Sequence, residues 1–173
     1  MPEITVLTGG VRSGKSCYAL EIAQPYAKKT FIATAVGFDD EMRQRIDVHK
    51  QERNASYICV EESLDLAGAL RKQSTDTGIV VIDCLTVWMG NILYHYTNRV
   101  EVDAAVAVFV QALSVVQCDV VVVTNEVGLG IIPDNELART YQNMLGMVNR
   151  KVTALADKVI LMVSGIPVVI KHH

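Results

Sequence analysis

The chain has 173 residues, 50% of them hydrophobic and 20% charged, which is long enough for one well-packed domain. Its formal net charge of −3 argues against a protein held to nucleic acid mainly by phosphate contacts. No apolar run approaches the length of a membrane span, and the first residues lack the basic and apolar regions of a signal peptide. We therefore expect a cytoplasmic protein with no membrane span and no nucleic-acid partner.

A short apolar segment at about 3–8 predicts a strand and leads directly into Gly9-Gly10-Val11-Arg12-Ser13-Gly14-Lys15-Ser16. This stretch matches the phosphate-binding pattern G-x-x-x-x-G-K-[ST], the P-loop, at every fixed position. Its backbone N–H groups can surround a polyphosphate, Lys15 can neutralise β- and γ-phosphate oxygens, and the Ser16 hydroxyl can bind Mg²⁺. A glycine-rich turn with a chance Lys-Ser pair is disfavoured, because a helix is expected to follow at about 15–27.

Strand and helix patterns alternate along the rest of the chain. Strands are expected at about 30–34, 57–60, 79–83, 119–124, 158–163 and 168–171, and helices at about 41–53, 63–72, 85–96, 100–116 and 135–156. Ser63 and Asp134 are the expected N-caps of two of these helices. The order predicts a single α/β domain over 1–173, a three-layer P-loop NTPase (RecA-like) fold. Its sheet is mostly parallel with an antiparallel C-terminal edge, because a tight turn separates the last two strands.

Two segments are expected at the carboxyl edge of this sheet. The β-branched run at 79–83 ends in Asp83, and in P-loop proteins such an acid holds Mg²⁺ opposite the serine of the loop. The segment 125–133 contains two glycines and a proline and follows another buried strand. It is therefore predicted to be a shaped loop where open α/β sheets bind ligands.

The expected helix at 41–53 is dense in charge, and Glu41, Arg45 and His49 share one face of it. Periodicity alone predicts a solvated helix and an ordinary surface histidine.

The four cysteines lie far apart without C-x-x-C spacing, so we expect small buried hydrophobes in a reducing compartment. Trp88 and His95 are expected to have packing roles in the core and on the surface.

Several of these stretches together resemble the bifunctional adenosylcobinamide kinase and adenosylcobinamide-phosphate guanylyltransferase family of cobalamin biosynthesis. The resemblance is carried by Thr8–Ser16, Ile32–Thr34, Asp39–Met42 with Arg45, Ile46 and His49, and the loop Asn125–Pro133. It extends to the tail in Leu137–Arg139, Gly146, Asn149, Ala156–Asp157 and Ser164–Lys171, and so covers essentially the whole chain.

The resemblance implies a two-step transferase. In the first step ATP or GTP would phosphorylate the aminopropanol hydroxyl of adenosylcobinamide. In the second step GTP would transfer GMP to that phosphate through a covalent GMP-histidine, and His49 is the matching position. The family is also trimeric, which implies a homotrimer.

The resemblance assigns nucleotide contacts beyond the P-loop to Thr34, Ala35, Val36, Lys50, Gln51, Glu52, Arg53, Glu61 and Asp83. Glu62 lies beside Glu61, and the sequence alone leaves open which of the two faces the nucleotide. Lys15 and His49 are the implied catalytic residues, and Ser16 and Asp83 the implied metal ligands.

Two other functions fit the P-loop without the resemblance. One is a kinase of another small alcohol or nucleoside, in which the segment around His49 is only a substrate lid. The other is a nucleotide-dependent switch module whose hydrolysis depends on a partner.

Overall fold

The computed structural model describes residues 2–35 and 57–172. The strands are β1 (Ile4–Gly9), β2 (Lys29–Ala33), β3 (Tyr57–Glu61), β4 (Ile79–Asp83), β5 (Asp119–Val123), β6 (Lys158–Val163) and β7 (Ile166–His172). The helices are α1 (Lys15–Ala23), α3 (Leu66–Arg71), α4 (Leu85–His95), α5 (Arg99–Ser114) and α6 (Glu136–Leu155). The predicted α/β alternation is confirmed over these ranges.

The strands form one seven-stranded sheet in the order β3-β2-β4-β5-β1-β6-β7. All neighbouring pairs are parallel except β6 and β7, which are antiparallel, as the tight turn between them predicts. The carboxyl ends of β4, β5 and β1 therefore lie side by side, and the residues that follow these strands share one edge of the sheet.

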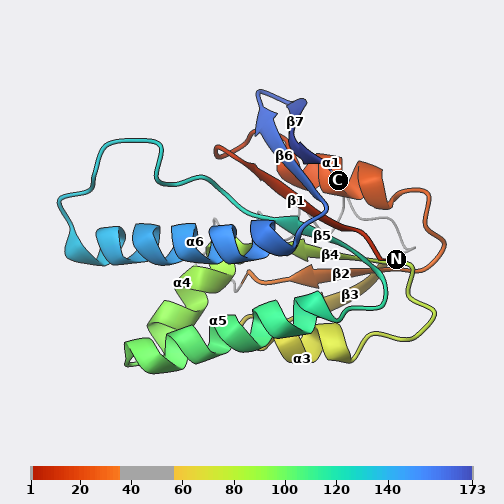
Figure 1. Ribbon diagram of the computed structural model, residues 1–173, viewed down its shortest axis with the longest axis horizontal. Coiled ribbons are helices and arrows are strands. Elements are labelled where there is room, and N and C mark those ends of the chain that lie inside the picture. Colours follow the sequence, from red (N-terminus) through yellow and green to blue (C-terminus); the bar gives the residue numbers. More distant parts are fainter. Residues whose placement is uncertain (1, 36–56, 173) are drawn as a thin grey trace.

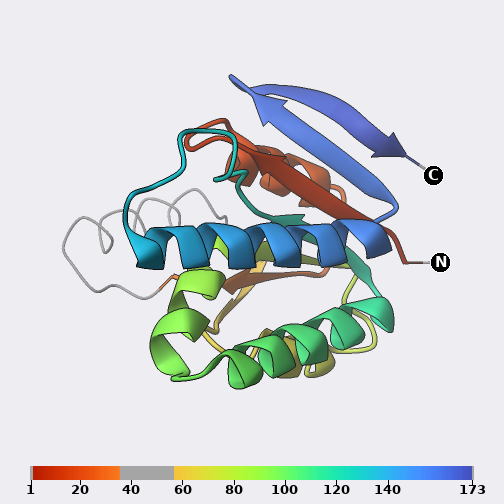
Figure 2. The same ribbon diagram turned by 60° about the vertical axis from the view of Figure 1, so that its left-hand side comes forward.

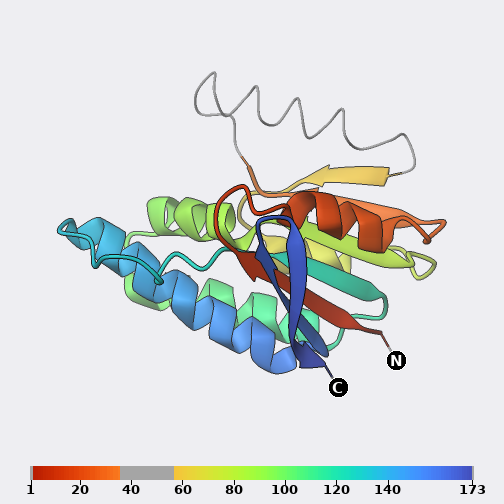
Figure 3. The ribbon, with the colours of Figure 1, turned by 90° about the horizontal axis from the view of Figure 1, so that it is seen from above.

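Helices cover both faces of the sheet. Val80 and Ile82 of β4 pack in a cluster with α3, α4, α5 and α6, whereas Val81 packs in a second cluster with α1. Figure 3 shows α1 on one side of the sheet and the longer helices on the other. This alternation explains why the central strands read as continuous apolar runs, since both of their faces are buried.

The structure confirms the packing roles expected of Trp88 and His95. Trp88 of α4 is 1% exposed, its ring lies 5.1 Å from that of Phe109, and its Nε1 donates a hydrogen bond to the carbonyl of Leu64 at 2.8 Å. His95 is exposed at the end of α4, with its ring against Tyr96.

Two predicted helix caps are wrong. The cap of α3 is Asp65 and not Ser63, because the Asp65 carboxylate accepts a hydrogen bond from the Gly68 N–H at 2.8 Å. The cap of α6 is Asn135 and not Asp134, since the Asn135 side chain accepts from the Ala138 N–H at 3.0 Å. In both cases a neighbouring polar residue was the better placed acceptor.

The expectation of buried cysteines is wrong for two of the four. Cys118 is buried and Cys84 is half-buried, but Cys17 on α1 and Cys59 on β3 are exposed. An apolar stretch does not show which of its sides a neighbouring element covers.

No helix in the described ranges has both the length and the apolar character needed to cross a membrane.

Candidate nucleotide-binding site

The P-loop has the backbone that its sequence predicts. Gly9 ends β1 with φ at 139°, and Gly14 precedes α1 with φ at 94°, a conformation that favours glycine. No side chain caps the amino end of α1, and its first turn carries no acidic residue. The first N–H groups of this helix are therefore suited to an anion.

Lys15 lies over its own loop. Its ammonium donates hydrogen bonds to the Gly10 carbonyl at 2.5 Å and to the Ser13 hydroxyl at 3.3 Å, and the residue is 7% exposed. Burial lowers the pKa of Lys15 below its ordinary value of 10.5, and Cys84 and Asp83 partly oppose this shift. A phosphate oxygen would stabilise the protonated, positively charged form of Lys15.

The P-loop is braced by the turn between β6 and β7. The Gly165 N–H donates to the Ser13 carbonyl at 3.0 Å, and the Cα of Gly165 lies 3.4 Å from where a Cβ of Gly14 would stand. In Figure 2 the β6–β7 hairpin lies beside β1 and the loop that follows it. The phosphate loop therefore has a support from the C-terminal end of the chain.

A hollow of about 420 Å³ lies over the P-loop. It is lined by Val11, Arg12, Ser13, Gly14, Lys15, Ser16, Cys17, Asp83, Cys84, Val123 and Asn125. The structure thus brings the predicted phosphate-binding loop and the predicted metal-side acid to one cavity.

Ser16 and Asp83 line this same hollow, and together they offer a hydroxyl and a carboxylate oxygen. Mg²⁺ prefers oxygen ligands, keeps several waters, and is commonly held by one or two protein groups together with substrate phosphates. The donor set therefore fits a magnesium ion bound with a nucleotide.

Thr34 is buried at the end of β2, and its hydroxyl holds the turn after β4. The hydroxyl donates to the Cys84 carbonyl at 2.9 Å and accepts from the Cys84 N–H at 2.8 Å. Asn91 donates to the Thr34 carbonyl at 2.8 Å. The Thr34 side chain is thus placed to position the Asp83–Cys84 segment, while the half-buried Ala35 follows it along the edge.

The two candidate glutamates have different surroundings. One Glu62 carboxylate oxygen accepts hydrogen bonds from the N–H groups of Leu64 and Asp65, both at 2.9 Å, at the start of α3. Glu61 is exposed at the end of β3. In the register of the sheet it lies beside Ala33 of β2, and Ala33 lies beside Asp83 of β4, so the three residues share the carboxyl edge. This arrangement favours Glu61 over Glu62 as the residue facing a nucleotide.

The remaining assigned residues lie outside the described ranges: Val36, His49, Lys50, Gln51, Glu52 and Arg53.

Two polar residues to which the sequence assigned no individual role, Glu126 of the predicted loop 125–133 and Asn149 of α6, also contact the segments that carry the site. Glu126 follows β5, its N–H donates to the Gly9 carbonyl at 3.3 Å, and its carboxylate accepts from the Thr8 hydroxyl at 2.9 Å. Asn149 of α6 is 6% exposed and donates to the Asn125 carbonyl at 3.0 Å. A polar residue at a buried helical position was the available signal, since such a group needs partners.

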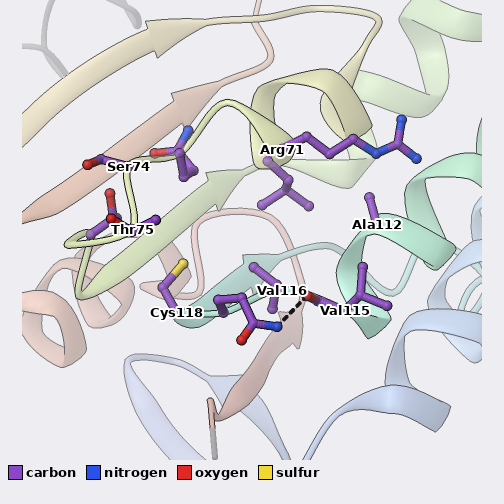
Figure 4. Close-up of a pocket in the computed structure, with 11 residues that line it drawn as sticks. Arg71, Ser74, Thr75, Ala112, Val115, Val116 and Cys118 are labelled. Carbon is purple, nitrogen blue, oxygen red and sulfur yellow. Dashed lines mark hydrogen bonds between the residues drawn. The ribbon is translucent and has the colours of Figure 1, made fainter.

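A second hollow, of about 220 Å³, lies between α3 and the end of α5, at the opposite edge of the sheet. Figure 4 shows Arg71, Ser74, Thr75 and Cys118 around it. None of the site residues expected from the sequence lines it, so the hollow over the P-loop is the candidate nucleotide site.

Comparison with known proteins gives one consistent family. The family model described as "Cobinamide kinase / cobinamide phosphate guanyltransferase" matches residues 5–170. The "Bifunctional adenosylcobalamin biosynthesis protein CobU" of Escherichia coli (strain K12) is 34% identical over 178 residues, covering 96% of this chain and 98% of the relative. The corresponding protein CobP of Pseudomonas aeruginosa is 32% identical over 167 residues and covers 96% of each chain.

Solved structures resemble the chain in fold. The RadB recombinase superposes with a TM-score of 0.54 at 17% identity, covering 99% of this chain and 81% of that one. A KaiC-like protein from Pyrococcus horikoshii OT3 gives 0.51 at 16% identity, covering 92% and 70%. The predicted P-loop NTPase (RecA-like) fold with an antiparallel edge is confirmed.

Proposed function

The chain belongs to the cobinamide kinase / cobinamide phosphate guanyltransferase family, and on that basis we propose that it carries out both reactions at the hollow over the P-loop. The observation that carries the proposal is that Lys15, Ser16 and Asp83 line one cavity at the carboxyl edge of the sheet. We assign this function to one domain spanning residues 1–173, located in the cytoplasm, where ATP and GTP are available.

In the kinase step the aminopropanol hydroxyl of adenosylcobinamide attacks the γ-phosphorus of ATP or GTP. A new P–O bond forms, the bond to the β–γ bridging oxygen breaks, the nucleoside diphosphate leaves, and the hydroxyl proton passes to water. The N–H groups of Gly9–Ser16 and the amino end of α1 bind the phosphates, and Lys15 stabilises the charge on the leaving oxygens. Mg²⁺, held by Ser16 and Asp83, would supply further charge neutralisation when bound.

In the guanylyl-transfer step an imidazole nitrogen of His49 attacks the α-phosphorus of GTP, and pyrophosphate leaves. The phosphate oxygen of adenosylcobinamide phosphate then attacks the same phosphorus and the bond to His49 breaks, giving adenosyl-GDP-cobinamide. A covalent intermediate replaces one difficult displacement with two easier ones. The cations Arg45, Lys50 and Arg53 lie close to His49 in sequence and would favour its neutral, nucleophilic form.

We also propose that the following residues form the rest of the nucleotide-binding site: Thr34, Ala35, Val36, Lys50, Gln51, Glu52, Arg53 and Glu61. The Thr34 hydroxyl contributes indirectly, because it is hydrogen-bonded to the backbone N–H and carbonyl of Cys84.

We also propose a homotrimer. Support comes from the last strand, where Ile166, Val168, Val169 and Ile170 are between 43% and 65% exposed on an edge of the sheet. Exposed apolar side chains on an edge strand are typical of a surface that another chain covers.

The test of the proposed function is to incubate the protein with Mg²⁺ and GTP labelled on the α-phosphate, and to measure label on the denatured chain. We expect acid-labile, base-stable label on the wild type and none on the His49→Ala variant. Lys15→Ala should remove both this label and nucleotide-dependent phosphorylation of cobinamide, because one P-loop serves both steps.

Two other outcomes would contradict parts of the proposal. Absence of label on a wild type that binds GTP would leave a kinase or a switch module on the same scaffold. Label retained by Lys15→Ala would show that guanylyl transfer does not depend on this P-loop.

A further inference from the structure

The hollow between α3 and the end of α5, here called the α3–α5 hollow, lies at the other end of the sheet from the nucleotide site. It is lined by the end of α3, the connection from α3 to β4, and the end of α5 with the residues that lead into β5. Thr77 lies just before β4, and Cys118 directly precedes β5. Asp83, at the far end of β4, lines the nucleotide hollow. A five-residue strand, about 17 Å long, therefore separates the two hollows.

The inner wall of the α3–α5 hollow is apolar. Leu70 of α3 and Ala112 of α5 are buried in this wall. Cys118 is also buried there, and Val116 is half-buried. Burial, followed by the negative charge of Asp119, raises the pKa of the Cys118 thiol, so the thiol stays protonated and uncharged at neutral pH. The wall therefore suits a hydrocarbon group and disfavours a charged one.

The rim of the hollow carries polar groups. Figure 4 shows Ser74 and Thr75 on one side of the hollow and Arg71, the last residue of α3, on the other. The Arg71 guanidinium makes no hydrogen bond or ion pair with the described residues, and the hydroxyls of Thr75 and Thr77 make none either. The Ser74 hydroxyl, in contrast, donates to the Asp76 carboxylate at 2.6 Å. Within this part of the chain, one cation and two hydroxyls are therefore available to a ligand.

Arg71 supplies the only charge among the described residues that line the hollow. Two acids adjoin the lining in sequence, and both are engaged: Asp76 forms an ion pair with Lys28, and Asp119 accepts a hydrogen bond from Tyr26. The helices α3 and α5 also end here, and the partial negative charge of their carbonyl ends would repel an anion. Binding of an anion therefore depends on the Arg71 guanidinium, which can hold a carboxylate through two parallel hydrogen bonds.

We infer that the α3–α5 hollow is a binding site for a small monocarboxylate with an aliphatic body. The carboxylate pairs with Arg71, and the hydrocarbon lies against Leu70, Ala112 and Val116. The volume of about 220 Å³ equals that of about seven water molecules in the liquid, which suits a ligand of about eight non-hydrogen atoms. A phosphate or a dicarboxylate fits less well, because its second negative charge would meet no cation among the lining residues. This site is separate from the proposed nucleotide site and does not depend on the proposed function.

The test is a titration of the whole protein with isocaproate, a branched aliphatic monocarboxylate, followed through the backbone amide signals in NMR spectra. We expect saturable shifts within residues 70–77 and 115–118, a dissociation constant on the order of one millimolar, and no shift in the P-loop. Isocaproamide has the same shape without the charge and should bind on the order of tenfold more weakly. Acetate, which lacks the aliphatic body, should also bind on the order of tenfold more weakly.

Three variants test the contacts. Arg71→Gln should weaken the binding of isocaproate on the order of tenfold and change that of isocaproamide by less than about twofold. Lys72→Gln is the matched control, because Lys72 is also an exposed cation at the end of α3 but does not line the hollow. It should change the affinity for isocaproate by less than about threefold. Thr75→Trp places a large side chain at the rim and should block both probes.

Several results would overturn this site. The absence of saturable shifts up to about 50 mM isocaproate, or shifts confined to the P-loop, would show that the hollow holds no such ligand. Equal affinity of the wild type and Arg71→Gln, or of isocaproate and isocaproamide, would refute recognition of the carboxylate. Unimpaired binding by Thr75→Trp would place the ligand elsewhere. A protein that binds isocaproate as expected but binds no GTP would overturn the proposed function and support this site.

Discussion

Gly9 and Gly10 are neighbours in the P-loop with different tolerance for a side chain. A Cβ on Gly9 would lie 2.4 Å from the carbonyl oxygen of Met162, and Gly9 has φ at 139°. Gly10 has no atom within 4 Å of that position. We expect Gly9→Ala to lower the free energy of unfolding by about 1–3 kcal/mol and Gly10→Ala to change it by less than about 0.5 kcal/mol, as measured by urea denaturation.

A contradictory result would be an equal loss of stability in both glycine variants. It would mean that the close approach of the Met162 carbonyl to Gly9 does not determine how well this position tolerates a side chain.

The contribution of Tyr26 to the free energy of unfolding depends on pH in the alkaline range. Its hydroxyl donates to the Asp119 carboxylate at 2.5 Å, and this hydrogen bond, followed by burial, raises the pKa of Tyr26 to about 12. The neutral form is favoured in the folded state, so the contribution is fully present below the unfolded pKa near 10 and is lost as pH rises toward 12. We expect Tyr26→Phe to cost about 1 kcal/mol at pH 7 and to flatten the fall in stability above pH 10, as measured by urea denaturation across pH.

Tyr94 is the control for that prediction because it is 89% exposed and makes no hydrogen bond within the described residues. Tyr94→Phe should leave the alkaline profile unchanged. If Tyr26→Phe and Tyr94→Phe have the same profile, the hydrogen bond to Asp119 has no role in alkaline stability.

At the residue scale the sequence predicted those parts of the site that have fixed spacing. The P-loop follows a pattern in which each position has a chemical task, and Asp83 is marked by its place at the end of an apolar run. Asn125 begins the predicted loop 125–133 and Asn149 belongs to the resemblance, but their contact could not be predicted, because it joins residues 24 positions apart and exists only after α6 packs on the sheet. The hydrogen bond of the Thr34 hydroxyl was unpredictable for the same reason, since its partner is a backbone carbonyl 50 positions away.

The start of α6 gives a test of capping at the element scale. The Asn135 side chain accepts a hydrogen bond from the Ala138 N–H, whereas Asp134 uses its carbonyl to accept from Arg139. We expect Asn135→Ala to cost about 1 kcal/mol of unfolding free energy and Asp134→Ala to cost less than about 0.5 kcal/mol. Urea denaturation of the two variants measures the difference, and the reverse order would restore Asp134 as the cap.

The elements themselves were well predicted from periodicity, because burial imposes a period on both strands and helices. The five expected helices within the described ranges are all present, and their ends differ from the expected ones by a few residues. The ends were harder to predict because several polar residues compete for each cap. At α3 the Glu62 carboxylate takes the N–H groups of residues 64 and 65, and the helix begins only at Leu66.

At the scale of the whole molecule, the alternation of strands and helices predicted the layers and the antiparallel edge. It did not predict which surfaces stay uncovered. The apolar run of β7 resembles a buried strand in sequence, but most of its residues are exposed in the single chain.

The exposed edge leads to a prediction about assembly. Ile170 of β7 is 59% exposed, and a lysine on an edge strand opposes pairing with another chain. We expect the wild type to be a trimer and Ile170→Lys to shift it toward the monomer, as measured by light scattering after size exclusion. Val115→Lys is the control, because Val115 is also exposed but lies after α5. A trimer that persists in Ile170→Lys would remove β7 from the interface.

The hydrogen bond from Gly165 to Ser13 joins the last hairpin to the phosphate loop. Two segments about 150 residues apart in sequence are therefore in direct contact. A truncation of the final strand, or a tag or surface attached to it, would therefore disturb the proposed phosphate-binding loop. For any experiment that immobilises this protein, the N-terminal side of the chain is no safer than the C-terminal side, because both lead to the same loop.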